Sequence, residues 1–195
     1  FVQRQFNYLL AALALFIVIL CSQIVEQQQQ YKQRKLIVYN IPKTSAIDFI
    51  NAKSNVLLTD TAFARNESRI LFHIKHNWWN LGMTDTQIIA GDIKTGNLTV
   101  QNNFIQFYNK KIVIINEKTI KGNKTSEVFL PVDYLVISNN PKLHVSDLSK
   151  QYLPSLIIFD SSNTDYKIKK WMSECEQLHQ AYYAVTSSGA LTIDI

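Results

Sequence analysis

The stretch that decides the fold is VDYLVISNNPKLHVSDL, residues 132–148. Its apolar run at 134–137 has the composition of a buried β-strand. Ser138 and a polar turn follow, and a short helix is predicted to begin near His144. A buried strand that leads through a polar turn into a helix is the layout of a metal-binding loop in many hydrolases. The side chains of the turn decide whether a metal can bind there.

The last third of the chain alternates between strands and helices. We expect a strand at 132–137, a helix at 144–151, a strand at 155–159, a helix at 165–179, and strands at 182–185 and 190–193. Asn163 or Thr164 can cap the long helix, and Gly189 supplies the final turn. This order indicates a layered sheet with helices on its outer faces.

The part before this stretch is rich in β-structure. Strands are predicted at 36–41, 46–50, 56–59, 98–100, 104–108 and 112–115. Apolar residues at helical spacing predict one helix over 63–81, which Gly82 stops. The whole pattern is compatible with an αββα sandwich, and periodicity alone does not select this fold from other mixed folds.

Residues 8–25, YLLAALALFIVILCSQIV, form an apolar segment without a charge. At about 1.5 Å per residue this segment approaches the roughly 30 Å of a bilayer core. A buried core helix and a signal peptide are the alternatives, but no A-x-A-like cleavage site follows. We therefore expect one transmembrane helix and a polar glutamine stalk over residues 1–30, and a second unit over 31–195.

The chain of 195 residues carries a formal net charge of +5, which suits a polyanion or an anionic lipid surface. Its 47% apolar content is enough for a real core. The two cysteines, Cys21 and Cys175, are expected to be free thiols, because one lies in the apolar segment and the other in a predicted helix. Lys32, Arg34 and Lys35 follow the apolar segment, and this charge favours a cytoplasmic second unit.

Four blocks of this sequence resemble the C-terminal part of ComEC-type competence proteins. They are KLIVYNIPKTSAIDFI at 35–50, VDYLVISNNPKLHVSDL at 132–148, LIIFDSSNTDYKIKKWMSECEQLH at 156–179, and SSGALTIDI at 187–195. The resemblance covers residues 35–195, and the preceding helix corresponds to the last membrane span of the family. It implies a reduced metallo-β-lactamase-like αββα sandwich.

The metal-binding residues of that family are missing. Complete relatives carry His-x-His-x-Asp-His where this chain has Asn139, Pro141, Leu143 and His144, so only His144 is a possible ligand. The family's Asp-Val-Gly-Gln-Gly-Asp turn is replaced over 40–45, and its Asp-Thr-Gly reads DTA at 60–62. We therefore expect no catalytic residues, no metal and no cofactor.

The resemblance implies a bacterial inner-membrane protein that takes up single-stranded DNA through a channel. The partners would be single-stranded DNA, the bilayer around residues 8–25, and the channel portion of the same full-length protein; no other competence protein is indicated. The family picture places the second unit in the periplasm, and we follow it over the charge count. Three Asn-x-Ser/Thr triplets, at Asn66, Asn97 and Asn123, then match the glycosylation acceptor by chance.

A cluster of cations and aromatic rings is the candidate DNA-binding site. It comprises Lys142, Tyr166, Lys167, Lys169, Lys170 and Trp171. Cations combined with aromatic faces are typical of single-strand binding, and the alternative is a solvated helix face.

Two further functions stay open. A metal-dependent nuclease acting on the non-transported strand would need relocated ligands, drawn from Asp60, His73, His76, His144 and Asp160. His73 and His76 are three residues apart on the predicted helix, but packing is the alternative for them. The polar loop at 160–163 could accept a phosphate, or could cap the helix that follows. The third function is a membrane-anchored structural domain with another partner.

Overall fold

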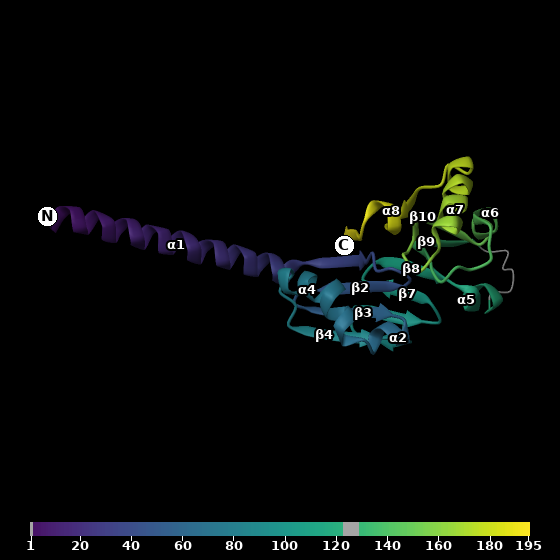
Figure 1. Cartoon of the computed structure of the whole chain (residues 1–195), viewed down its shortest axis with the longest axis horizontal. Coiled ribbons are helices and arrows are strands. Elements are labelled where there is room, and N and C mark those ends of the chain that lie inside the picture. Colours follow the sequence, from purple (N-terminus) through teal and green to yellow (C-terminus); the bar gives the residue numbers. More distant parts are fainter. Residues whose placement is uncertain (1, 123–128) are drawn as a thin grey trace.

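The computed structural model describes residues 2–122 and 129–195, so the triplet at Asn123 lies outside the described residues. Helix α1 (Val2–Lys32) projects from a body that holds all the other elements (Figure 1). Within α1, the segment Tyr8–Lys32 is long and apolar enough to cross a membrane, and none of it is buried. The helix continues two residues past the predicted stalk. The division of the chain at residue 30 stays a prediction.

The first sheet has the strand order β12-β1-β2-β3-β4. Its strands are β1 (Arg34–Val38), β2 (Ala46–Asn51), β3 (Ser54–Thr59), β4 (Asp85–Ile89) and β12 (Leu191–Asp194). Strands β1, β2 and β3 form an antiparallel meander, whereas β4 runs parallel to β3. The C-terminal strand β12 pairs with β1, so the two ends of the domain sequence meet in one sheet.

The second sheet has the order β11-β10-β9-β8-β7-β6-β5. Its strands are β5 (Ile93–Lys94), β6 (Leu98–Gln101), β7 (Phe104–Phe107), β8 (Lys110–Ile115), β9 (Leu130–Ile137), β10 (Tyr152–Phe159) and β11 (Tyr182–Ala184). Strands β8 to β11 are parallel, so crossovers make the three connections between them. The connections contain α5 (Glu117–Gly122), α6 (Val145–Leu148) and α7 (Asp165–Gln177) in that order.

Three apolar clusters define four layers. One cluster lies between the sheets and includes Phe49 and Phe107, whose ring centroids are 5.4 Å apart. The second joins the outer face of the first sheet to the helices between β3 and β4. The third joins the outer face of the second sheet to α6 and α7, with Trp171 stacked on Phe159. Figure 1 shows these helices on opposite sides of the body. The predicted α/β class, with two sheets, outer helices and one apolar N-terminal helix, is confirmed.

The helix expected over 63–81 is confirmed over 67–80, where the chain is helical without interruption, but its predicted start is wrong. The chain instead forms α2 (Thr61–Ala64), α3 (Glu67–Ile70), a π-helix η1 (Leu71–Lys75) and α4 (His76–Asn80). The break falls at Asn66, whose side chain accepts a hydrogen bond from the Arg69 N–H and starts a new helix. Gly82 ends the series with φ +68°, as expected.

Several short elements were not predicted. They are β4, β5, helix α5 (Glu117–Gly122) and helix α8 (Val185–Ser188). Each is too short for its pattern to repeat, and β4 is mostly exposed, so it has no alternation of buried and exposed residues. Both cysteines are free, as expected. Burial raises the pKa of the Cys175 thiol to about 12.

Candidate functional site

The ends of strands from both sheets meet around the stretch at residues 132–148. The backbone N–H of Lys43, after β1, donates to the Ser161 carbonyl, after β10, at 3.0 Å. The N–H of Ile41 donates to the Ser161 hydroxyl at 3.0 Å. Ser45, before β2, has its hydroxyl 3.3 Å from that of Ser138, which follows β9. The two sheets are therefore joined by hydrogen bonds at the place where the family resemblance predicts a metal loop.

Asp160 is the centre of this network and has no exposed surface. It accepts hydrogen bonds from the Ser138 hydroxyl and the Ser162 hydroxyl. The Ser162 N–H at 3.1 Å and the Asn163 amide at 3.0 Å complete the shell. Burial raises the pKa of the Asp160 carboxyl to about 6, although these donors favour the charged form.

The loop after β9 turns through two successive left-handed residues, Asn139 at φ +62° and Asn140 at φ +51°. Asparagine tolerates this conformation better than most residues. The Asn139 N–H donates to the Ser162 hydroxyl at 2.7 Å, and the Asn140 N–H donates to the Asn163 side chain at 2.9 Å. Hydrogen bonds between neutral side chains and backbone thus close the loop.

The four positions that replace the family's metal ligands have separate surroundings. Pro141 is buried, and Leu143 packs against the outer core of the second sheet. His144 precedes α6, as predicted, but its Nδ1 lies 3.1 Å from the Glu174 carboxylate rather than near a backbone group. Asn139 is the one of the four that lines the cavity at the strand ends.

That cavity has a volume of about 380 Å³. Its polar lining includes Ser45, Asp60, Asp92 and Ser138. The three carboxylates of the lining accept backbone hydrogen bonds: Asp60 from the Ser45 N–H at 3.1 Å, Asp92 from the Asn102 N–H at 3.0 Å, and Glu117 from the Lys142 N–H at 3.1 Å. Within residues 2–122 and 129–195, no three His, Cys, Asp or Glu side chains are close enough to hold a metal ion together.

The relocated ligands proposed for a nuclease do not converge. His73 lies on η1 against Phe72, and the exposed His76 lies on α4 against Trp79. The helix-cap interpretation of the loop at 160–163 is also wrong. Thr164 precedes α7 without a side-chain cap bond, and the Asn163 amide donates to the carbonyl of Ile137 at 2.6 Å instead.

The candidate DNA-binding residues surround a second cleft of about 390 Å³ on α7. Lys142, Tyr166, Lys167, Lys170 and Trp171 line it, whereas the exposed Lys169 does not. The Lys167 ammonium donates to the carbonyls of Asn140 and Pro141, so it holds the loop after β9.

Trp171 is only 1% exposed, and its indole N–H points to the Leu143 carbonyl at 3.4 Å. Its ring is therefore closed to base stacking in this conformation. Tyr166 is 80% exposed and is the aromatic side chain that this cleft offers to solvent. Lys170 lies 3.8 Å from Glu174, which partly offsets its charge.

A buried polar cluster around Asp48 was missed from the sequence. The Asp48 carboxylate, on β2, accepts from the Trp78 indole at 2.7 Å, the Asn55 amide at 2.8 Å and the Tyr39 hydroxyl at 3.1 Å. Burial raises the pKa of both Asp48 and Tyr39. The available signal was one aspartate inside the apolar strand AIDFI at 46–50. This cluster fastens α4 to the first sheet.

The raised pKa of Asp160 predicts a pH dependence of stability. An unfolded aspartate titrates near 3.9, and in the folded protein the pKa of Asp160 is about 6. Between these values the folded protein keeps a proton that the unfolded chain has lost. Its contribution to the free energy of unfolding is therefore full below about pH 4, falls as pH rises to about 6, and is constant above. The expected loss is about 2–3 kcal/mol.

Urea denaturation at several pH values between 4 and 7.5 measures this effect, and Asp160→Asn provides the comparison. The free energy of unfolding of the wild type minus that of Asp160→Asn should decrease as pH rises from about 4 to about 6. Subtraction of the two curves removes the contribution of Asp48, which has the same sign. A difference that does not change with pH would mean that Asp160 is charged throughout.

The family model described as the ComEC C-terminal domain matches residues 36–195, which is most of the chain and all of both sheets except the first two residues of β1. No curated protein matches, and no solved structure does.

Proposed function

Because this chain belongs to the family of ComEC C-terminal domains, we propose that it is the C-terminal part of a membrane protein that takes up single-stranded DNA in natural competence. In this proposal α1 anchors the domain in the bacterial inner membrane, and the channel portion of the same protein is its partner. The domain faces the periplasm and is non-catalytic, serving in docking, gating or guidance of the strand.

One observation carries the non-catalytic role. The strand-end loop is closed by the Ser138–Asp160–Ser162 hydrogen bonds in the region where a hydrolase of this family would hold its ions. Asn139, Pro141 and Leu143 supply no imidazole or carboxylate. The network joins the two sheets through serine hydroxyls that surround the Asp160 carboxyl. The loop is thereby suited to support the fold rather than to activate water.

Metal analysis of the purified chain tests this role. We expect no stoichiometric zinc or manganese after dialysis against a metal-containing buffer. Addition of a chelator should leave the thermal unfolding midpoint unchanged, because no ligand set contributes to stability. Stoichiometric metal, or a lowered midpoint with chelator, would favour the nuclease alternative.

The cleft on α7 supports a guiding contact with DNA. Lys142, Lys169 and Lys170 are exposed, and Tyr166 offers a face for one base. We expect substitution of these three lysines by glutamine to weaken single-strand binding and to lower its salt slope by about 2, at about 0.7 per phosphate contact. Fluorescence anisotropy of a labelled oligonucleotide at several salt concentrations measures both. Lys167 stays intact in this variant because it holds the loop after β9.

A matched control removes the same charge elsewhere. Lys75, Lys94 and Lys111 are exposed and lie outside the α7 cleft. Their triple glutamine variant should retain the wild-type salt slope within about 0.5. An equal loss in both variants would indicate that only net charge matters. Absence of salt-sensitive binding in the wild type would leave docking of another protein as the role of the domain.

A further inference from the structure

Helix α1 is joined firmly to the end of the domain from which it leaves. The Gln33 side chain donates to two carbonyls, Ala52 in the β2–β3 turn and Leu81 at the end of α4, each at 2.8 Å. The Ala52 N–H donates back to the Gln33 carbonyl at 2.9 Å. The Lys53 ammonium lies 4.6 Å from the centre of the Tyr31 ring. Both the sheet and the helical layer are therefore bonded to Gln33, the residue that follows α1, and Lys53 contacts Tyr31 in the last turn of the helix.

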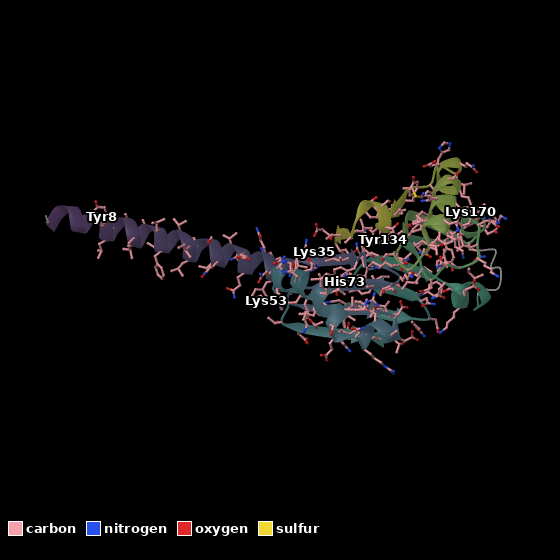
Figure 2. All side chains as sticks on the ribbon, in the orientation of Figure 1. Tyr8, Lys35, Lys53, His73, Tyr134 and Lys170 are labelled. Carbon is pink, nitrogen blue, oxygen red and sulfur yellow. The ribbon has the colours of Figure 1, made fainter. Side chains whose placement is uncertain are left out.

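This junction lies next to the end of the apolar segment. A groove lined by Val25 and Glu26 on α1 reaches Asn80 and Leu81 at the end of α4. At Gly82 an added Cβ would overlap the Gln30 side chain, so the backbone there touches α1. Figure 2 shows Lys53 at this end of the domain and Lys170 at the far end.

The length of the stalk sets the height of α4 above the bilayer. Residues 26–32 span about 10 Å of helix. The headgroup layer on each side of the roughly 30 Å hydrocarbon core is about 5–8 Å thick. If α1 crosses the membrane along residues 8–25, the last turn of α4 reaches the outer limit of the headgroups.

Trp79 lies in that last turn and is 64% exposed, whereas Trp78 beside it is buried. An exposed tryptophan places a large apolar surface in contact with water. Tryptophan is enriched at the interface of bilayer and water because its ring is apolar and its N–H is polar. Tyr31, also 60% exposed, lies in the last turn of α1. Two exposed aromatic residues thus flank the junction of α1 and the domain.

We propose that Trp79 inserts into the headgroup region of the bilayer that α1 crosses, so that the end of α4 is a second contact between domain and membrane. The inference rests on the proposed membrane span. The apolar ring is the group that gains by leaving water.

Quenching by brominated lipid tests the contact. The chain is reconstituted in nanodiscs of phosphatidylcholine that carries bromine near the top of its acyl chains. Trp79 is one of the 3 tryptophans, and the other two are buried in the domain. We expect a loss of about one third of the tryptophan emission in the wild type. The Trp79→Phe variant should lose no emission.

Two reporters in the Trp79→Phe background separate the inference from the span itself. Phe16→Trp, in the middle of α1, is measured in lipid that carries bromine near the end of its acyl chains, and it should be quenched there if the helix crosses the bilayer. Tyr166→Trp, exposed on α7 at the far end, should not be quenched. Quenching of Phe16→Trp without quenching of Trp79 would overturn the inference and leave the span intact.

Two further outcomes would contradict the insertion of Trp79 into the headgroup region. If neither Phe16→Trp nor Trp79 is quenched, the span and the inference fall together. If Tyr166→Trp is quenched as strongly as Trp79, the domain contacts lipid without a defined orientation, and the specific role of Trp79 is wrong.

Discussion

Replacement of Asp48 by alanine is expected to lower the free energy of unfolding by about 3–5 kcal/mol. The variant leaves the Trp78 indole, the Asn55 amide and the Tyr39 hydroxyl buried without their acceptor. Each unsatisfied buried donor costs about 1–3 kcal/mol. Urea denaturation followed by tryptophan fluorescence measures the loss, and Trp78 itself reports on the separation of α4 from the sheet.

Two variants control for this prediction. Asp48→Asn keeps one acceptor oxygen for Trp78 and Tyr39, so it should lose less than half as much stability as Asp48→Ala. Asp85→Ala removes an exposed carboxylate from β4 and should change stability by no more than about 0.5 kcal/mol. Equal losses in the Asp48 variants would show that the charge of Asp48, not its acceptor geometry, stabilises the cluster.

Replacement of Trp171 by alanine should lower the free energy of unfolding by about 3–5 kcal/mol, because it empties the space between α7 and the second sheet. The ring is 5.7 Å from that of Phe159, and the side chain is 1% exposed. The Lys167 ammonium, 5.9 Å from the ring centre, would also lose its aromatic neighbour. Thermal unfolding followed by near-ultraviolet circular dichroism measures the change.

Tyr166→Ala on the same helix is the matched control, because this side chain is 80% exposed. It should leave stability within about 0.5 kcal/mol of the wild type. The pair also separates folding from binding. Tyr166→Ala should weaken single-strand binding without unfolding, whereas Trp171→Ala should weaken it only where the domain unfolds. A folded Trp171→Ala protein with impaired binding would contradict the buried position of the ring.

The sequence predicted best those elements whose pattern repeats. Helix α7 places Ile168, Trp171 and Cys175 on one buried face, at a spacing that fixes a helix of three or more turns. The apolar runs of β9 and β10 are typical of parallel strands covered on both faces. The start of the helix predicted over 63–81 was misplaced because the apolar spacing continues across Asn66, while the helix begins there anew with a side-chain cap.

The candidate site was only partly predictable. The absence of metal ligands follows directly from Asn139, Pro141 and Leu143. The network that occupies the region does not, because Ser138 and Asp160 are 22 residues apart and only the pairing of β9 with β10 brings them together. The burial of Trp171 was readable from the same helical face as Ile168 and Cys175, and that signal contradicts its use as a stacking platform.

The hydrogen bonds of Gln33 connect α1 directly to the domain. Its two carbonyl partners belong to different layers, so both layers are bonded to the residue that follows α1. When the hydrocarbon core of a bilayer is thinner than the length of an apolar segment such as residues 8–25, the helix tilts. Tilting keeps the apolar segment within the hydrocarbon. If α1 crosses the bilayer as proposed, such a tilt would be carried into the domain and would displace the far end on α7 more than the near end on α4. In that case, membrane thickness would affect the position of the α7 cleft.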